Sequence, residues 1–368
     1  MSDRSWIATA LATALDSVAA RLDVDRFPHV TSGGEWVLSD DGEWTGGFWI
    51  GLLWAGYEER GDPRFRVAAE RLLRRFAARA GETRNHDLGM MFCPSAVKGY
   101  ELTGDPRFRE AGLEAARSLA SQFNRRGGFI PGWGFFGDAG WEGAVLVDTL
   151  MNLPLLWWAA DESEELERFR AVALSHGDTS LAHHLRRDGS TFHVYRFDPQ
   201  TGVPIRGDTY QGKAPGSCWS RGQAWAIAGC ARLARLGAGE RYRMAAERAA
   251  AYYLDHLPDD LVPYWDFDAK PDEPRDTSAG AIAAYGLLLL DDEEASDAAE
   301  RCLRTLVEHA QAPPGHPAIL LHATADLPHG IAVDESTIYG DYFFVRALQL
   351  LRNRIHATAG AAAHETGG

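Results

Sequence analysis

YEERGDPRFR, at residues 57–66, recurs as YELTGDPRFR at residues 100–109, and this repeat is the strongest indication of the fold. In both copies an apolar stretch ends at a glycine, and an Asp-Pro dipeptide begins the next stretch. Glycine commonly ends a helix, aspartate caps the following one, and proline fits its first turn. The repeat therefore predicts pairs of helices joined by short turns, and a weaker copy, GERYR, occurs at residues 239–243. Such units are typical of stacked hairpins or of a closed ring.

Two kinds of helical segment alternate on either side of this repeat. Amphipathic segments rich in Arg, Ala and Glu are expected near residues 5–22, 63–80, 107–123, 163–183, 240–257 and 294–311. More apolar, glycine-punctuated segments are expected near residues 45–58, 88–102, 145–160, 219–235, 276–290 and 337–352. Amphipathic helices suit an outer ring and apolar helices an inner one, so the alternation predicts an all-α (α/α)6 toroid of six helical hairpins. Pro154 predicts a separate turn before the third inner helix.

One stretch departs from the helical period. Residues 191–197 (TFHVYRF) alternate between apolar and polar side chains, as in a strand. Residues 198–202 (DPQTG) have the signature of a turn, and residues 203–211 are expected to form the returning strand. We expect a short β-hairpin inserted near the toroid mouth, where inserted loops usually carry specificity. The remaining pattern predicts one barrel domain over residues 1–355 and a flexible Ala/Gly-rich tail over residues 356–368.

Composition limits the partners and the compartment. The chain has 368 residues, of which 45% are hydrophobic, enough for a large core. Its net charge of −15 argues against nucleic acid or an anionic membrane as a partner. The four cysteines are scattered, as expected for buried thiols in a reducing compartment. Because the chain start has no signal-peptide pattern and no apolar run is long enough to span a bilayer, we expect a cytoplasmic protein, either monomer or dimer.

Two aspartates begin apolar inner segments: Asp87 in NHDLG (residues 85–89) and Asp148 in LVDTLMN (residues 146–152). A carboxylate at the head of a buried helix is unfavourable unless it is paired or open to a cleft. The six inner-helix starts of a toroid converge on one mouth, so Asp87 and Asp148 are candidates for a general acid/base pair. An aspartate in this position can also be a simple N-cap. We favour that role for Asp276 and leave Asp341 undecided between the two.

Other polar and aromatic side chains occur at the same helix starts. Arg221, within WSRGQAW (residues 219–225), requires an anion, either a protein carboxylate or a substrate carboxylate. His86 and His193 either contact a substrate or serve as hydrogen-bonded core residues. Tryptophans in glycine- and serine-punctuated segments commonly stack on sugars or line pockets, which applies here to Trp44, Trp133, Trp219 and Trp225. The chain has no HExxH motif and no paired Cys/His spacing, so we expect no metal site.

Taken in order, these blocks resemble the unsaturated glucuronyl hydrolases of glycoside hydrolase family 88, from about Trp44 to Leu351. The blocks are WTGGFWIGLLWAGYE (44–58), NHDLGMMF (85–92), VDTLMNLPLLWWA (147–159), DGSTFHVYRFDPQTG (188–202), WSRGQAWAI (219–227), VPYWDFDA (262–269), PRDTSAGAIAAYGLL (274–288) and YGDYFFVRAL (339–348). Each block alone is weak evidence, whereas their common order is specific. The related unsaturated rhamnogalacturonyl hydrolases match the fourth and sixth blocks less well.

The resemblance implies a barrel that acts on oligosaccharides produced by polysaccharide lyases, which carry a 4,5-unsaturated uronic acid at the non-reducing end. The implied reaction hydrates the double bond: a carboxylic acid protonates C4, water adds at C5, and the hemiketal rearranges to release the aglycone sugar. The resemblance implies neither a metal nor another cofactor. Asp148 matches the acid/base position and Asp87 a second essential carboxylate. Polar substrate contacts are matched by His86, His193, Gln211 and Arg221, and the aromatic lining by Trp44, Trp133, Trp219, Trp225 and Tyr339.

Several questions stay open at the level of sequence. A like charge nearby would raise the pKa of one aspartate, whereas a helix N-terminus would lower it. Lys213, in the segment before WSRGQAW, predicts a preference for sulfated aglycones. Other functions that fit the toroid are a rhamnogalacturonyl-type hydrolase, an inverting glycosidase with carboxylates roughly 6.5–9.5 Å apart, a sugar 2-epimerase that uses histidines, and a non-catalytic sugar-binding protein.

Overall fold

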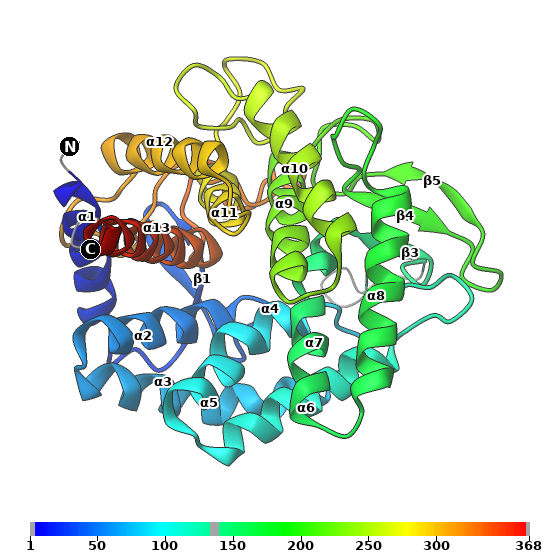
Figure 1. Ribbon diagram of the computed structural model, residues 1–368, viewed down its shortest axis with the longest axis horizontal. Coiled ribbons are helices and arrows are strands. Elements are labelled where there is room, and N and C mark those ends of the chain that lie inside the picture. The colour runs from blue at the N-terminus through cyan, green and yellow to red at the C-terminus, as the bar shows by residue number, and fades with distance from the viewer. Residues whose placement is uncertain (1–3, 133–139, 366–368) are drawn as a thin grey trace.

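The computed structural model describes residues 4–132 and 140–365, with helices arranged in two concentric rings (Figure 1). Within these residues the outer ring consists of α1 (Ser5–Ala19), α3 (Pro63–Phe76), α6 (Pro106–Ser121), α8 (Leu166–His183), α10 (Glu240–Asp255) and α12 (Glu293–His309). The inner ring consists of α2 (Gly46–Arg60), α4 (Leu88–Phe92) with α5 (Lys98–Thr103), α7 (Leu153–Glu162), α9 (Ser220–Arg235), α11 (Thr277–Leu288) and α13 (Ile338–Glu365). Two short helical segments complete this part of the chain. The first, η1 (Ala77–Gly81), follows α3, and the second, η2 (Cys93–Val97), joins α4 to α5.

The inner ring closes on itself. Each inner helix contacts the next in the order α2, α4, α7, α9, α11, α13, and α13 returns to α2. The amphipathic outer helices pack between and behind them, as α3 does on α2 and α10 on α9. The predicted (α/α)6 toroid is therefore confirmed, and each of the twelve expected helical segments corresponds to an observed one.

The repeated turn has the predicted geometry in both copies. Gly61 and Gly104 end their helices in the left-handed conformation, with φ of 61° and 68°. Asp62 and Asp105 each accept a hydrogen bond from the backbone N–H two residues later, at 2.9 Å. Proline then occupies the first turn of α3 and of α6. Both turns reverse the chain from an inner helix to an outer one.

The inner helices approach one another closely where they begin. A Cβ on Gly47 would lie 2.0 Å from the carbonyl oxygen of Met91, and a Cβ on Gly89 would lie 2.3 Å from Cα of Asn152. Only glycine fits such approaches. Pro154 lies in the first turn of α7, and the separate turn predicted before it is η3 (Val147–Met151). These contacts bring the starts of α2, α4 and η3 together at one end of the barrel.

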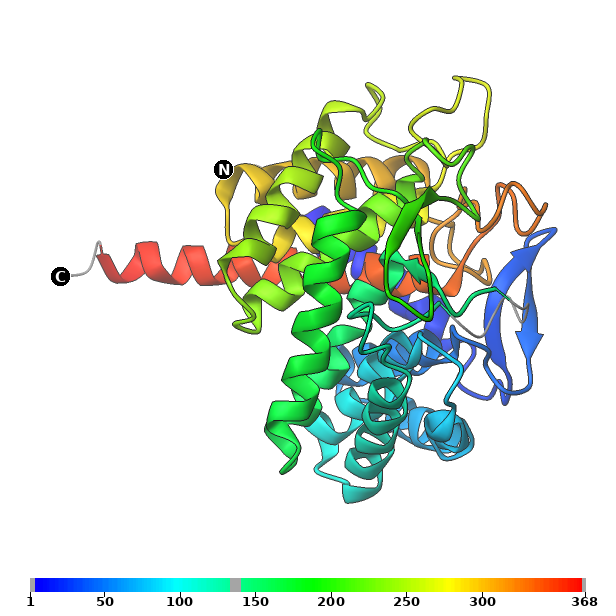
Figure 2. The same ribbon diagram turned by 90° about the vertical axis from the view of Figure 1, so that its right-hand side faces the viewer.

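Two small sheets lie at that end. The predicted hairpin is β4 (Val194–Phe197) and β5 (Pro204–Asp208), and a third strand that the sequence did not indicate, β3 (Ala144–Leu146), pairs with β4. An N-terminal hairpin, β1 (Phe27–Ser32) and β2 (Glu35–Ser39), was also missed, although Gly33-Gly34 between two short alternating runs is a hairpin signal. Figure 2 shows β1, β2 and the segment before α13 at the end of the molecule opposite the C-terminus.

The last inner helix is longer than expected. α13 continues to Glu365 without a break near residue 355, and its C-terminal part projects from the barrel (Figure 2). The single-domain boundary and the flexibility of the tail therefore stay predictions, although the tail is helical where it is described. No helix in the described part of the chain has the length and apolar character needed to cross a membrane.

Candidate active site

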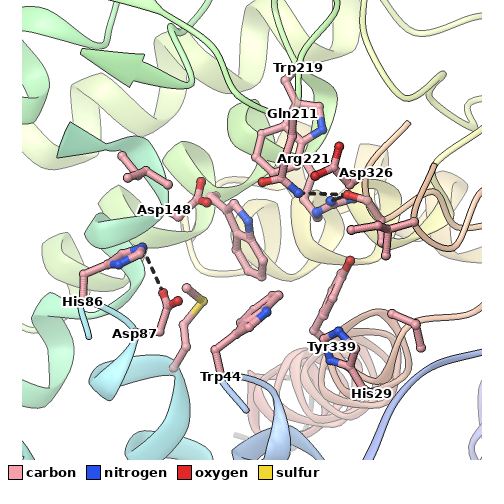
Figure 3. A pocket seen from close by; sticks show the side chains of 16 residues that line it. His29, Trp44, His86, Asp87, Asp148, Gln211, Trp219, Arg221, Asp326 and Tyr339 are labelled. Atoms are coloured by element: carbon pink, nitrogen blue, oxygen red, sulfur yellow. Dashed lines mark hydrogen bonds and ion pairs between the residues drawn. The ribbon is translucent and has the colours of Figure 1, made fainter. Parts of the chain in front are cut away.

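A cleft lined by polar and aromatic side chains opens at the toroid mouth. Figure 3 shows His86, Asp87 and Asp148 on one side and Arg221 and Asp326 on the other. The inner-helix starts supply most of the polar and aromatic lining, and β1, the loop after β5 and the segment before α13 supply the rest. The lining residues are His29, Val30, Trp44, His86, Asp87, Met90, Leu146, Asp148, Gln211, Trp219, Arg221, Trp225, Ala325, Asp326, Ile331 and Tyr339.

Asp87 stands at the N-terminus of α4 but does not cap it. None of the described N–H groups of α4 bonds to its side chain, and its own N–H donates to Oδ1 of Asn85 at 2.9 Å. Its carboxyl Oδ1 lies 3.4 Å from Nε2 of His86 and accepts a 3.4 Å hydrogen bond from Nδ2 of Asn152. Burial raises the pKa of Asp87, and the charge of His86 opposes that rise. The side chain is thus directed into the cleft.

Asp148 lies in η3, the turn between β3 and α7. Its side chain is buried, and its Oδ1 has no hydrogen-bond partner among the described residues. Burial holds the pKa of Asp148 well above its usual range, the charge of Asp87 adds to the rise, and Arg221 opposes it. The sequence left open whether the pKa of Asp148 is raised or lowered. In the structure it is raised, which favours the protonated form of the acid.

His193, just before β4, faces Asp148. Its Nδ1 accepts hydrogen bonds from the backbone N–H groups of Gln211 and Tyr210, at 3.2 and 3.3 Å, which assigns the proton of the neutral ring to Nε2. That Nε2 lies 3.8 Å from Oδ2 of Asp148. Burial, together with Arg221, holds the pKa of His193 well below its usual value, so the ring is neutral. A neutral N–H donor therefore stands beside the acid.

Arg221 has a protein carboxylate as its anionic partner. Its buried guanidinium pairs with Asp276 and donates to the carbonyl oxygens of Thr324 (2.7 Å) and Ala325. It is enclosed by the rings of Trp219 and Tyr339, 4.4 and 5.3 Å from Cζ. Arg221 also lines the cavity, so its contact with a substrate carboxylate stays a prediction.

Asp276 and Asp341, the other two aspartates at inner-helix starts, bind partners within the protein. Asp276 accepts the N–H of Ser278 at 3.1 Å, so the predicted N-cap is confirmed, and it also neutralises Arg221. Asp341 accepts the N–H groups of Ile319 and Leu320, at 3.0 and 2.8 Å, and burial raises its pKa to about 8. Asp341 therefore holds the segment before α13 and does not line the cleft.

Aromatic rings form the wall between the two polar sides. The rings of Trp44 and Tyr339 stack with centroids 5.1 Å apart, and Trp225 lies 6.4 Å from Tyr339. Gln211, also predicted, donates from Nε2 to the carbonyl of Ala325 at 2.9 Å. Trp133, the remaining predicted site residue, lies outside the described residues. The other predicted aromatic and polar residues meet at the cleft or, like His193, directly behind it.

Lys213 does not support the predicted preference for sulfated aglycones. Its ammonium group pairs with Glu273 at 2.5 Å, and that pairing lowers the pKa of Glu273 to about 2. Lys213 is also not among the residues that line the cavity. No group of three or more potential metal-ligating side chains occurs within residues 4–132 and 140–365.

The structure adds lining residues that sequence reasoning missed. His29, on β1, contacts Thr45 Oγ1 through Nδ1 at 2.8 Å, and burial lowers its pKa. Asp326 and Ile331 come from the segment before α13, which has little regular structure. Neither segment has a helical period that would have placed these residues at the mouth.

A pair of carboxyl groups in a sugar-sized cleft is typical of glycoside hydrolases, and this is the class of protein that the site indicates. A family model described as Glycosyl Hydrolase Family 88 matches residues 19–321. The chain belongs to this family.

Curated relatives and solved structures agree with this assignment. The chain is 37% identical to an unsaturated glucuronyl hydrolase of Bacillus sp. strain GL1, over 90% of this chain and 92% of that protein. It is 35% identical to an unsaturated chondroitin disaccharide hydrolase of Streptococcus pyogenes serotype M1, over 93% and 90%. The crystal structure of the Bacillus sp. GL1 enzyme superposes with a TM-score of 0.89 at 36% identity, over 93% of this chain and 96% of that one. An unsaturated glucuronyl hydrolase specific for heparin superposes with a TM-score of 0.91 at 31% identity, over 96% and 98%.

Proposed function

We propose that this protein is an unsaturated uronyl hydrolase. It hydrates the C4=C5 double bond of the unsaturated uronic acid at the non-reducing end of lyase-generated oligosaccharides and so releases the aglycone sugar. The observation that carries the proposal is Asp148: burial and a second carboxyl group raise its pKa, as a general acid at neutral pH requires. Family membership and the names of the relatives support the same reaction class.

The reaction begins with proton transfer. The protonated carboxyl of Asp148 gives its proton to C4, and positive charge develops at C5 and the ring oxygen. Water then adds at C5 and returns one proton to the Asp148 carboxylate, which restores the acid. The resulting C5 hemiketal opens to a ketone, and the hemiacetal left at C1 expels the aglycone as an alcohol. One carboxyl group acts as acid and then as base, so the protein needs no second proton donor.

The neighbouring residues assist this cycle. The Nε2–H of His193 faces Asp148 and is placed to stabilise its carboxylate after proton transfer. Asp87, fixed by Asn152 and His86, raises the pKa of Asp148 and is placed to accept hydrogen bonds from sugar hydroxyls. The stacked rings of Trp44 and Tyr339 offer an apolar face for a sugar ring.

The proposal is tested by following the ultraviolet absorbance of the conjugated uronate during incubation with a panel of lyase-generated disaccharides. We expect the wild type to remove the absorbance of at least one disaccharide, and Asp148→Asn to lose at least a thousandfold in kcat. Asp334→Asn, which changes an exposed aspartate paired with His322, is the matched control and keeps wild-type activity. Persistence of the absorbance with every disaccharide would overturn the proposal.

We also propose that the enzyme works in the cytoplasm. All four cysteines fall within the described residues, and each is buried and free of a disulfide. Buried free thiols suit a reducing compartment. Fractionation of the producing cells, with activity followed by loss of uronate absorbance, tests this point, and activity confined to the secreted fraction would contradict it.

A further inference from the structure

A histidine at the end of an outer helix contacts both chain segments that carry the acid and its neighbouring donor. His184 directly follows α8, and Figure 1 shows β3 and β4 beside this helix. His184 is only 1% exposed, and its ring Nε2 lies 3.0 Å from the carbonyl oxygen of Val145 in β3. The backbone carbonyl of His184 accepts the N–H of Phe192 at 3.0 Å. Asp148 follows the first contact point by three residues, and His193 follows the second by one.

The ring of His184 is a neutral hydrogen-bond donor. A carbonyl oxygen only accepts hydrogen bonds, so the contact with Val145 places the ring proton on Nε2. Burial lowers the pKa of His184 to about 4, so the ring carries no charge at neutral pH. Its Nδ1 makes no hydrogen bond to any of the described residues. Exchanging this ring for an apolar side chain therefore removes the bond to Val145 and no charge.

These contacts belong to a closed circuit of hydrogen bonds behind the acid. Val145 leads within two residues to Val147, whose N–H donates to the carbonyl of His193 at 2.9 Å. His193 follows Phe192, whose N–H returns to the carbonyl of His184. The circuit therefore ties the backbone on both sides of the acid and its neighbouring donor to the outer ring, through His184.

The geometry of proton transfer depends on this backbone. Nε2 of His193 lies 3.8 Å from Oδ2 of Asp148, and both side chains are buried. A reacting group must be held to within about 0.5 Å of its productive position, and a displacement of about 1 Å costs roughly a hundredfold in rate. The stacked rings of Trp44 and Tyr339 belong to other elements of the cleft. A loosened circuit therefore lowers kcat and leaves substrate binding nearly unchanged.

We propose that His184 is a positioning residue of the enzyme, whose ring holds the carbonyl of Val145 so that Asp148 keeps the alignment needed for proton transfer to C4. The inference rests on the proposed function. His184 is not among the residues that line the cleft, so it acts through the backbone of β3. Its main-chain bond to Phe192 survives any substitution, and the ring's bond to Val145 is the part that a variant can remove.

The test measures kcat and KM by the loss of uronate absorbance, on the disaccharide that wild type consumes fastest. His184→Leu removes the donor, and we expect kcat to fall by about tenfold or more while KM stays within about threefold of wild type. His184→Gln carries an amide N–H that reaches the carbonyl of Val145, so it keeps kcat within about threefold of wild type. The matched control is Tyr242→Phe, which removes a 3.0 Å hydrogen bond to Asp178 on the same outer helix and leaves kcat unchanged.

Two further measurements cover the case in which His184→Leu does not fold, as judged by thermal melting. His184→Asn, whose amide is too short to reach Val145, carries the same expectation. Nitrogen NMR of the wild type, with the ring signals assigned by comparison with His184→Gln, reads the tautomer directly. We expect the ring proton on Nε2, and a proton on Nδ1 would overturn the proposal.

The outcomes separate this role from the proposed function. A folded His184→Leu or His184→Asn with kcat close to that of wild type would overturn the role of His184. An equal loss of kcat in folded His184→Gln would overturn it as well, because the hydrogen bond would then not be the cause. A wild type that leaves the double bond of every disaccharide intact would instead overturn the proposed function.

Discussion

Asp148 is the residue on which the proposed chemistry depends, and its environment explains why. Its pKa is raised chiefly because the charged form is buried, and secondarily because Asp87 is close. His193 is neutral for the same reason, since burial penalises its charged form. The protonated acid and the neutral histidine are therefore the forms that the site stabilises. The pH dependence of activity follows from this.

We expect kcat to fall as pH rises through the raised pKa of Asp148, because the ionised carboxylate has no proton to give to C4. Asp87→Asn removes the neighbouring negative charge, so the pKa of Asp148 falls and the decline begins at lower pH. The same variant loses at least a hundredfold in kcat, because Asp87 is proposed to orient the substrate. Rates measured from pH 4 to 9 for both proteins check this, and an unshifted profile in Asp87→Asn would show that the two carboxyls do not interact.

At the level of elements, the sheet β3–β4–β5 joins residues that are far apart in the chain. Leu146 pairs with Val194, and the N–H of Val147 donates to the carbonyl of His193 at 2.9 Å. Because Asp148 is the second residue after β3 and His193 directly precedes β4, this register places the two side chains opposite each other. The hairpin that the sequence predicted thus helps to position His193 beside Asp148.

The repeated turn provides a test of element stability. Gly104 has a φ of 68°, and a Cβ added to it would meet nothing within 4 Å, so a substitution there changes the backbone energy alone. We expect Gly104→Ala to lower the free energy of unfolding by about 1–2 kcal/mol, because an alanine is strained in the left-handed region. Gly104→Asn should cost less, since asparagine tolerates this conformation. Urea unfolding measures both, and equal losses in the two variants would contradict the conformational explanation.

At the scale of the whole molecule, the site reduces stability. Asp148 has an ordinary pKa of 3.8 and a folded-state pKa well above it, so the folded protein binds more protons than the unfolded chain between these values. Stability therefore falls as pH rises through this interval. The contribution of Asp148 to the stability of the folded protein is therefore least favourable at pH values above the raised pKa.

Asp148→Asn removes this titration. We expect the variant to be more stable than wild type at pH 8, because the amide, unlike the ionised carboxylate, carries no charge into the buried site. The advantage should shrink as pH falls and vanish below pH 3.8, where both states of the wild type are protonated. Denaturant unfolding at pH 8 and at successively lower pH measures the difference, and a gap that does not change with pH would refute a buried, ionisable Asp148.

The helical framework could be predicted from sequence because its signals are local. Gly104, Asp105 and Pro106 determine a helix end and the next helix start within three residues, and the alternation of amphipathic and apolar segments assigns each helix to a ring. The hairpin β4–β5 had an equally local signal. The strand β3 had none, because three buried residues acquire strand geometry only from pairing with β4.

The site was predictable only in part, for a physical reason. Asp87, Asp148 and Arg221 stand at the starts of inner helices, so a ring topology alone brings them to one mouth. The partner of Arg221, the raised pKa of Asp148 and the presence of Asp326 depend on contacts between segments far apart in the chain. Local pattern therefore specified the helices and the residues at their starts, whereas burial, charge pairing and the lining from β1 and the segment before α13 arose only when the ring closed.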